Sequence, residues 1–183
     1  MTKRIRCLFL PFLALFLTIA AFSSPQAAAA ETDFTVASKA ALSVDFETGK
    51  VFYNQDADKP MGIASVTKII GLYLIEEQIK EGKLKWEDPV TISEDVSKLS
   101  VAPDLSNVAL NAGEQYSVKE LFEASFIASG NAAIVALAEK VAGSEPKFVD
   151  MMKEKVESWG IKDATLVNAS GLNNSYLGET IYP

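Results

Sequence analysis

Ser65 and Lys68 are the residues whose types and spacing could do covalent chemistry in this chain. Three residues apart on a helix, their side chains would lie on one face. A serine hydroxyl is a weak nucleophile until a base takes its proton. A lysine can be that base once burial lowers its pKa enough to leave it neutral. The pair therefore predicts a serine nucleophile activated by a lysine.

The composition removes the more common hydrolytic sites. The 183 residues include no histidine, and the one cysteine is Cys7. A Ser-His-Asp triad needs an imidazole as its base, and Cys-His catalysis and His/Cys zinc sites are excluded for the same reason. We expect neither a metal nor a cofactor.

The spacing alone is weak evidence, because Ser144 and Lys147 repeat it. Ser144 has another explanation: it precedes Glu145 and Pro146 as the N-cap of a helix. Ser65 could likewise be a cap followed by a solvated lysine. Against this, Lys68 opens a helix with almost no polar face, which is typical of a buried helix.

Ser129-Gly130-Asn131 is a second candidate, because it interrupts two apolar helical stretches with poor helix formers. It is either a helix–helix turn with an asparagine cap or a short loop that points a hydroxyl and an amide into a cleft. The residues alone leave both interpretations open.

The remaining pattern predicts a hairpin followed by helices. The hairpin joins residues 40–46 to 51–53 through a turn that contains Gly49. We expect residues 96–113 to be mostly loop. The other predicted elements are a helix over 65–79, a strand over 90–92, a helix opened by a Ser117 capping box and ending near 128, helical spacing over 132–141, a helix from Ser144 to 159, and an extended piece over 165–167.

The first 30 residues read as a secretory signal peptide. Lys3, Arg4 and Arg6 precede an apolar stretch over 7–22, and the small residues 27–30 offer a cleavage site. The stretch is short and contains Pro11, which argues against a retained membrane anchor. We expect an exported protein at the cell envelope or outside the cell, whose residues 31–183 form a partial catalytic domain. Membrane contact would come only from parts outside this chain.

The charge of the chain limits its partners. The formal net charge is −7, and loss of the three basic residues would make the exported part more acidic. An acidic exported domain is a poor candidate for binding nucleic acid or an anionic membrane.

The two motifs, in this order, match the signature of penicillin-binding proteins and class A β-lactamases. Residues 60–68, PMGIASVTK, contain Ser65 and Lys68. This segment resembles the nucleophile segment of serine D-alanyl-D-alanine carboxypeptidases. Ser129-Gly130-Asn131 resembles their second motif, and Asn168-Ala169-Ser170-Gly171-Leu172 resembles a Gly-Leu segment that lines their site. The resemblance runs from about Thr35 to the end of the chain.

The resemblance implies a role for each matching residue. Ser65 would be the acyl-enzyme nucleophile and Lys68 its proton acceptor. Ser129 and Asn131 would relay protons and hold the peptide amide, with Gly130 between them. Gly171 and Leu172 would also bind substrate. The substrate would be a peptidoglycan stem peptide ending in D-Ala-D-Ala, and β-lactam antibiotics would bind at the same place.

The implied fold is α+β and β-lactamase/transpeptidase-like: an antiparallel sheet with packed helices and a helical subdomain. The family's third motif, Lys-Thr-Gly on a sheet strand, does not occur in the sequence. We therefore expect a chain truncated before the later strands, inactive by itself. Two alternatives stay open: a class A-like β-lactamase, although Ala169 stands where such an enzyme would carry its deacylating glutamate, and a non-catalytic exported wall-binding domain.

Overall fold

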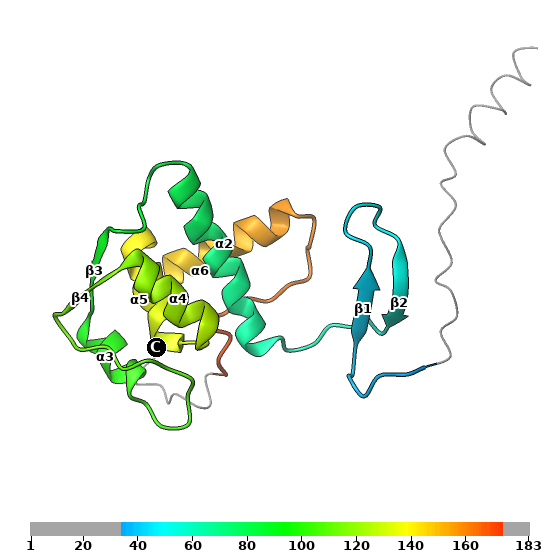
Figure 1. Ribbon diagram of the computed structural model, residues 1–183, viewed down its shortest axis with the longest axis horizontal. Helices are drawn as coiled ribbons and strands as arrows, with labels where there is room; N and C mark the ends of the chain where they lie inside the picture. The colour runs from blue at the N-terminus through cyan, green and yellow to red at the C-terminus, as the bar shows by residue number, and fades with distance from the viewer. Residues whose placement is uncertain (1–33, 174–183) are drawn as a thin grey trace, which may run out of the picture. The chain divides into compact units, whose positions relative to one another are not determined.

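The computed structural model describes residues 34–173, which fall into two compact units that divide between Met61 and Gly62 (Figure 1). The predicted signal peptide lies outside the described residues. No helix within residues 34–173 has both the length and the hydrophobicity that crossing a membrane requires.

The first unit contains the predicted hairpin, which is confirmed. Strand β1 (Ala41–Val44) pairs antiparallel with β2 (Val51–Gln55), with an irregularity between Ser43 and Val44. In the turn, the Asp45 carboxylate accepts a hydrogen bond from the backbone N–H of Thr48 at 2.8 Å. Gly49 takes the left-handed backbone that a hairpin turn requires, with φ +68°.

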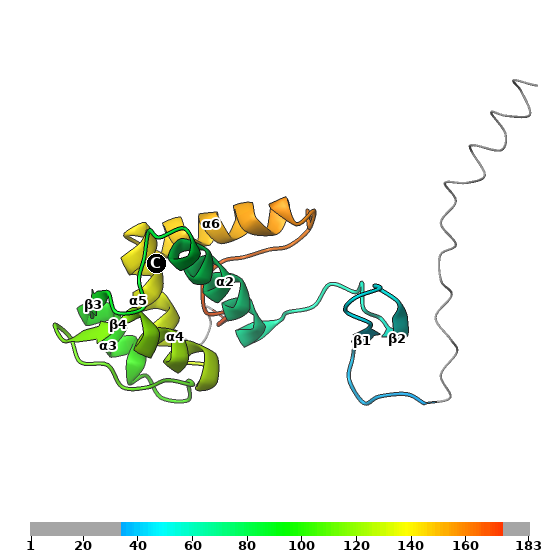
Figure 2. The ribbon, with the colours of Figure 1, turned by 45° about the horizontal axis from the view of Figure 1, so that its top comes forward.

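The second unit is helical and carries both candidate motifs. Helix α5 lies at its centre, with α4 and α6 packed against it and α2 crossing all three (Figure 2). A small sheet of β3 and β4 lies beside α3 (Figure 1). The elements of this unit are η1 (Ala64–Val66), α2 (Thr67–Lys80), β3 (Pro89–Thr91), α3 (Glu94–Ser100), β4 (Gln115–Ser117), α4 (Val118–Ile127), α5 (Asn131–Ala142) and α6 (Glu145–Ser158).

Small residues let the helices approach one another closely. Positions 131–138 of α5 are all buried, and four of them are alanine. On α2, a Cβ at Gly71 would lie 3.1 Å from the Phe148 ring and 3.2 Å from Ile134. This packing fixes the start of α2, which carries Lys68 and directly follows the turn η1 with Ser65, against the core.

Two boundaries differ from the prediction. The helix expected from Ser65 starts as the single 3₁₀ turn η1 and becomes α-helical at Thr67. The prediction of mostly loop over 96–113 is wrong in its first part, because α3 covers residues up to Ser100. Its start is set by Ser93, whose hydroxyl accepts from the backbone N–H of Val96 at 3.2 Å.

The other local predictions are mostly confirmed. Ser117 forms both halves of the capping box with Glu120. Strand β3 is present, but its partner β4 was not predicted. Ser144 occupies the N-cap position of α6 without a side-chain cap hydrogen bond, so the expected capping role of its hydroxyl is wrong. Residues 165–167 form no strand.

Candidate active site

The nucleophile candidate lies on the single turn that leads into α2. Ser65 is exposed within η1, and Ala64 before it has an unusual left-handed φ of +45°. Lys68 lies one turn further on and is only 2% exposed. Its Nζ is 3.0 Å from Ser65 Oγ. The helix start therefore presents an accessible hydroxyl to a buried amine.

Burial makes Lys68 a usable base. It lowers the pKa of the amine from 10.5 to about 8. Within residues 34–173, Lys68 makes no ion pair that would oppose this shift. At pH 7 a pKa of 8 leaves about a tenth of the amine neutral. The neutral form has a lone pair that can accept the Ser65 proton across the 3.0 Å between Nζ and Oγ.

The Gly-Leu segment, residues 168–172, contacts this pair from the C-terminal end of the described residues. The Lys68 amine donates a hydrogen bond to the backbone oxygen of Ser170 at 2.9 Å. Gly171 has φ +75°, and a Cβ there would overlap the Ala64 carbonyl oxygen and lie 2.8 Å from Thr67 Oγ1. Only glycine fits this approach without displacing backbone. The segment thus packs directly against the nucleophile turn.

The Ser129-Gly130-Asn131 motif separates α4 from α5, as the sequence predicted. Ser129 is half-buried and has a left-handed φ of +55°. Gly130 is buried, and a Cβ there would lie 3.0 Å from the Ala124 carbonyl oxygen. The motif is therefore a tight, conformationally unusual turn.

Asn131 is held by the loop between α3 and β4. Its backbone N–H and its side-chain Nδ2 both donate to the Ser106 carbonyl oxygen, at 3.1 and 2.9 Å. The side chain is 2% exposed, and its Oδ1 is buried without a partner in the described part of the chain. A buried, unpaired acceptor is costly, which is expected where a ligand supplies the missing donor.

The structure connects some of the predicted site residues and not others. Ser65 and Lys68 are hydrogen-bonded, and Gly171 packs against their turn. Between positions 34 and 173, the Ser129 hydroxyl makes no hydrogen bond to either of them. Leu172 is half-buried. Substrate contacts by Gly130, Asn131, Gly171 and Leu172 stay predictions.

The groups that hold the motifs in place could not be predicted from the motifs themselves. Two are backbone carbonyls, those of Ser170 and Ser106, for which a sequence carries no signal. A third is Asn107, whose Oδ1 accepts from the backbone N–H of Ala132 at 2.9 Å and so caps α5 from another segment.

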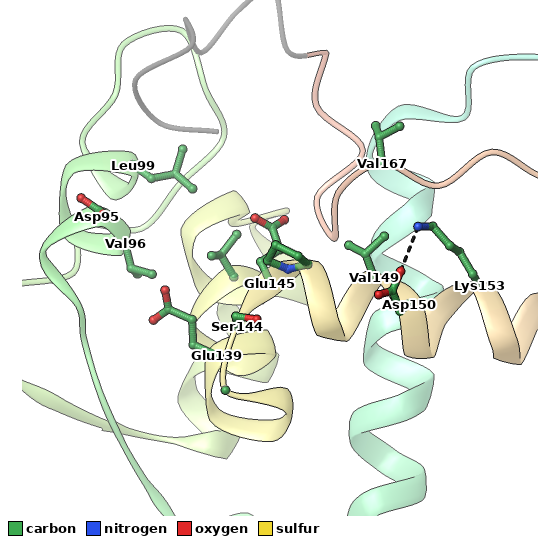
Figure 3. Close-up of a pocket in the computed structure, with 13 residues that line it drawn as sticks. Asp95, Val96, Leu99, Glu139, Ser144, Glu145, Val149, Asp150, Lys153 and Val167 are labelled. Carbon is green, nitrogen blue, oxygen red and sulfur yellow. Dashed lines mark hydrogen bonds and ion pairs between the residues drawn. The ribbon is translucent and has the colours of Figure 1, made fainter. Parts of the chain in front are cut away.

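A cavity of about 500 Å³ lies away from this site, between α3, α5 and the start of α6 (Figure 3). Its lining includes none of the predicted site residues. Acidic side chains lie on one side of it, and an ion pair between Lys153 and Asp150 lies on the other (Figure 3). Within the described ranges, no group of three or more acidic, histidine or cysteine residues could hold a metal ion. The lining residues are Asp95, Val96, Leu99, Val135, Glu139, Gly143, Ser144, Glu145, Pro146, Val149, Asp150, Lys153 and Val167.

Residues 25–182 match the family model described as D-alanyl-D-alanine carboxypeptidase, peptidase S11. The chain belongs to this family. Among curated proteins it is 39% identical to the D-alanyl-D-alanine carboxypeptidase DacF of Bacillus subtilis over 134 residues, 73% of this chain and 33% of the relative. The family assignment confirms the resemblance stated from the two motifs.

Solved structures of relatives confirm the fold. A peptidoglycan synthesis regulatory factor (PBP3) from Streptococcus pneumoniae matches with a TM-score of 0.77 and 48% identity, over 82% of this chain and 42% of the other. Penicillin-binding protein 5 from Haemophilus influenzae matches with a TM-score of 0.75 and 30% identity, over 80% and 42%. The predicted β-lactamase/transpeptidase-like class is therefore correct. The chain spans a third to two fifths of the length of these relatives.

Proposed function

We propose that this chain is the nucleophile-bearing part of a serine D,D-carboxypeptidase that removes the terminal D-alanine of peptidoglycan stem peptides. The observation that carries the proposal is the hydrogen bond between Ser65 and the buried Lys68. Membership of the D-alanyl-D-alanine carboxypeptidase family supplies the substrate class.

In the proposed reaction, neutral Lys68 accepts the Ser65 proton as Oγ attacks the carbonyl carbon of the penultimate D-alanine. The C–N bond to the terminal D-alanine then breaks, and its nitrogen leaves with a proton. Ser129 relays protons, and the unpaired Asn131 Oδ1 accepts from the substrate's peptide N–H. The backbone N–H of Ser65 provides one donor to the oxyanion. Water then hydrolyses the acyl-enzyme and frees Ser65.

We further propose that β-lactams acylate the same serine, since a relative of this chain is named a penicillin-binding protein. Export follows from the predicted signal peptide over residues 1–30. The mass of the protein recovered from the cell envelope checks this: a product that retains residues 1–30 would contradict it.

Release of D-alanine from a D-Ala-D-Ala peptide tests the proposed activity. The assay uses the longest protein of the reading frame that contains this chain, because the family's Lys-Thr-Gly motif does not occur in this sequence. We expect Ser65→Ala to abolish this release. Ser144→Ala should leave the release unchanged, because Ser144 is the N-cap residue of α6 and repeats the serine–lysine spacing by chance. Release that survives Ser65→Ala would contradict the proposal.

A further inference from the structure

The segment over residues 168–172 is held in place by side chains instead of by a neighbouring strand. Asn168 is 2% exposed, and Ala169 and Ser170 are fully buried, yet the segment has no regular secondary structure. Buried backbone groups need partners. One partner comes from α6, where Glu145 Oε1 accepts from the backbone N–H of Ala169 at 2.8 Å.

Asn168 makes most of the remaining contacts of the segment. Its Oδ1 accepts from the backbone N–H of Gly171 at 2.7 Å and from the Ser170 hydroxyl at 3.3 Å. Its Nδ2 donates to the Leu172 carbonyl oxygen at 2.8 Å. Asparagine side chains commonly set the shape of a turn in this way. Here the three hydrogen bonds of Asn168 bend the chain around Ser170. None of them uses the Ser170 carbonyl oxygen, which can therefore accept from a group outside the turn.

That carbonyl oxygen accepts from the buried Lys68 amine at 2.9 Å. A neutral amine has two N–H donors and one lone pair. When one N–H is bound to Ser170, rotation of the amine about its carbon–nitrogen bond is restricted. The lone pair can then be directed at Ser65 Oγ, which is 3.0 Å from Nζ.

We propose that Asn168 is a positioning residue of the active site: its carboxamide shapes the 168–172 turn so that the Ser170 carbonyl orients the Lys68 amine toward Ser65. Asn168 touches neither reacting atom and acts through the backbone of Ser170. This role rests on the proposed function, since it requires Lys68 to act as the base for Ser65.

The electrostatic surroundings of Lys68 give the proposal a distinctive pH signature. The carbonyl oxygen of Ser170 stabilises the ammonium form, while burial opposes it. The charged side chain that contacts this segment is Glu145 of α6, whose Oε1 accepts from the backbone N–H of Ala169. If the Ser170 carbonyl turns away while Lys68 stays buried, the pKa of Lys68 falls further. If the segment instead opens to water, the pKa rises toward the ordinary value of 10.5.

The test measures the rate of acylation by a fluorescent penicillin against pH, in the longest protein of the reading frame, for wild type, Asn168→Ala and Asn168→Asp. Asn173→Ala is the matched control, because Asn173 is exposed beside the same segment. For Asn168→Ala we expect the high-pH plateau to fall at least about tenfold, and the midpoint of the rise to move about 0.5 pH unit lower. Asn173→Ala stays within about twofold of wild type.

Asn168→Asp keeps an oxygen for the Gly171 N–H and adds a negative charge to the turn, which favours the lysine ammonium. We expect its plateau within about threefold of wild type and its midpoint at higher pH; this variant also carries the test if Asn168→Ala does not fold. An unchanged plateau in Asn168→Ala, a midpoint moved upward in it, or a plateau lost in Asn168→Asp would overturn the proposal. Absence of acylation in wild type would instead refute the proposed function.

Discussion

Lys68 is the residue on which the account depends. It is charged by type, yet it is 2% exposed and its partners are a hydroxyl and a carbonyl oxygen. Lysines are almost never fully buried without an opposite charge. The helix around it predicted this burial, because almost every residue from Ile69 to Ile75 is apolar. The Ser65 contact was predictable because it is local, three residues along one helix.

The acid side of the pH profile should report the protonation of Lys68. Burial lowers its pKa to about 8, and only the neutral amine can take the Ser65 proton. Acylation of Ser65 should therefore be slow below pH 8, rise about tenfold per pH unit toward it, and level off above it. Stopped-flow acylation rates between pH 6 and 10 measure this. A profile that is flat over this range would show that Lys68 is not the base.

Replacing Lys68 by alanine separates chemistry from folding. A methyl group cannot accept a proton, and the chain has no histidine to substitute. We expect acylation to fall by roughly 10²- to 10⁴-fold, the range for loss of a general base, while the circular dichroism spectrum stays that of the wild type. An unchanged acylation rate would mean that Lys68 is not the base and that its spacing from Ser65 reflects only a helix cap.

The elements position the site through contacts that are distant in sequence. Ser170 reaches Lys68 across 102 positions, and Ser106 reaches Asn131 across 25. Both acceptors are backbone atoms, so the sequence has no residue type that could have predicted them. Helix α3 was not predicted, although Ser93 as an N-cap and two acidic residues in the first turn indicated its start.

Gly171→Ala tests whether the 168–172 segment must pack against the nucleophile turn. The new Cβ would overlap the Ala64 carbonyl oxygen, so the segment has to move away from Ser65 and Lys68. Gly113→Ala is the matched control, because Gly113 has a similar φ of +79° and no atom within 4 Å of the added Cβ. Both variants should lose about 1–2 kcal/mol of stability from the left-handed backbone.

Only Gly171→Ala should also lose acylation, by about tenfold or more for a displacement near 1 Å. Thermal unfolding and penicillin acylation of both variants measure the two effects. Equal acylation by Gly171→Ala and Gly113→Ala would show that the close approach at Ala64 has no part in the chemistry.

At the scale of the whole molecule, the second unit alone contains all seven predicted site residues. The fold class came from the motifs, since the two small sheets and the helices seen here would not by themselves have distinguished a penicillin-binding protein from other α+β proteins. The prediction that the apolar helix is buried is wrong for one side of α2, because Ile69 and Tyr73, with Val66 just before the helix, are more than 40% exposed in this unit.

The most direct test of the account is to map the residue that a labelled penicillin acylates in the longest protein of the reading frame. Two serines have a lysine three positions later, but only Ser65 has it buried and hydrogen-bonded. Lys147, beside Ser144, is exposed. After proteolysis and mass spectrometry we predict one labelled peptide, the one that contains Ser65, and no label in Ser65→Ala. Label on the Ser144 peptide, or label that persists in Ser65→Ala, would contradict the account.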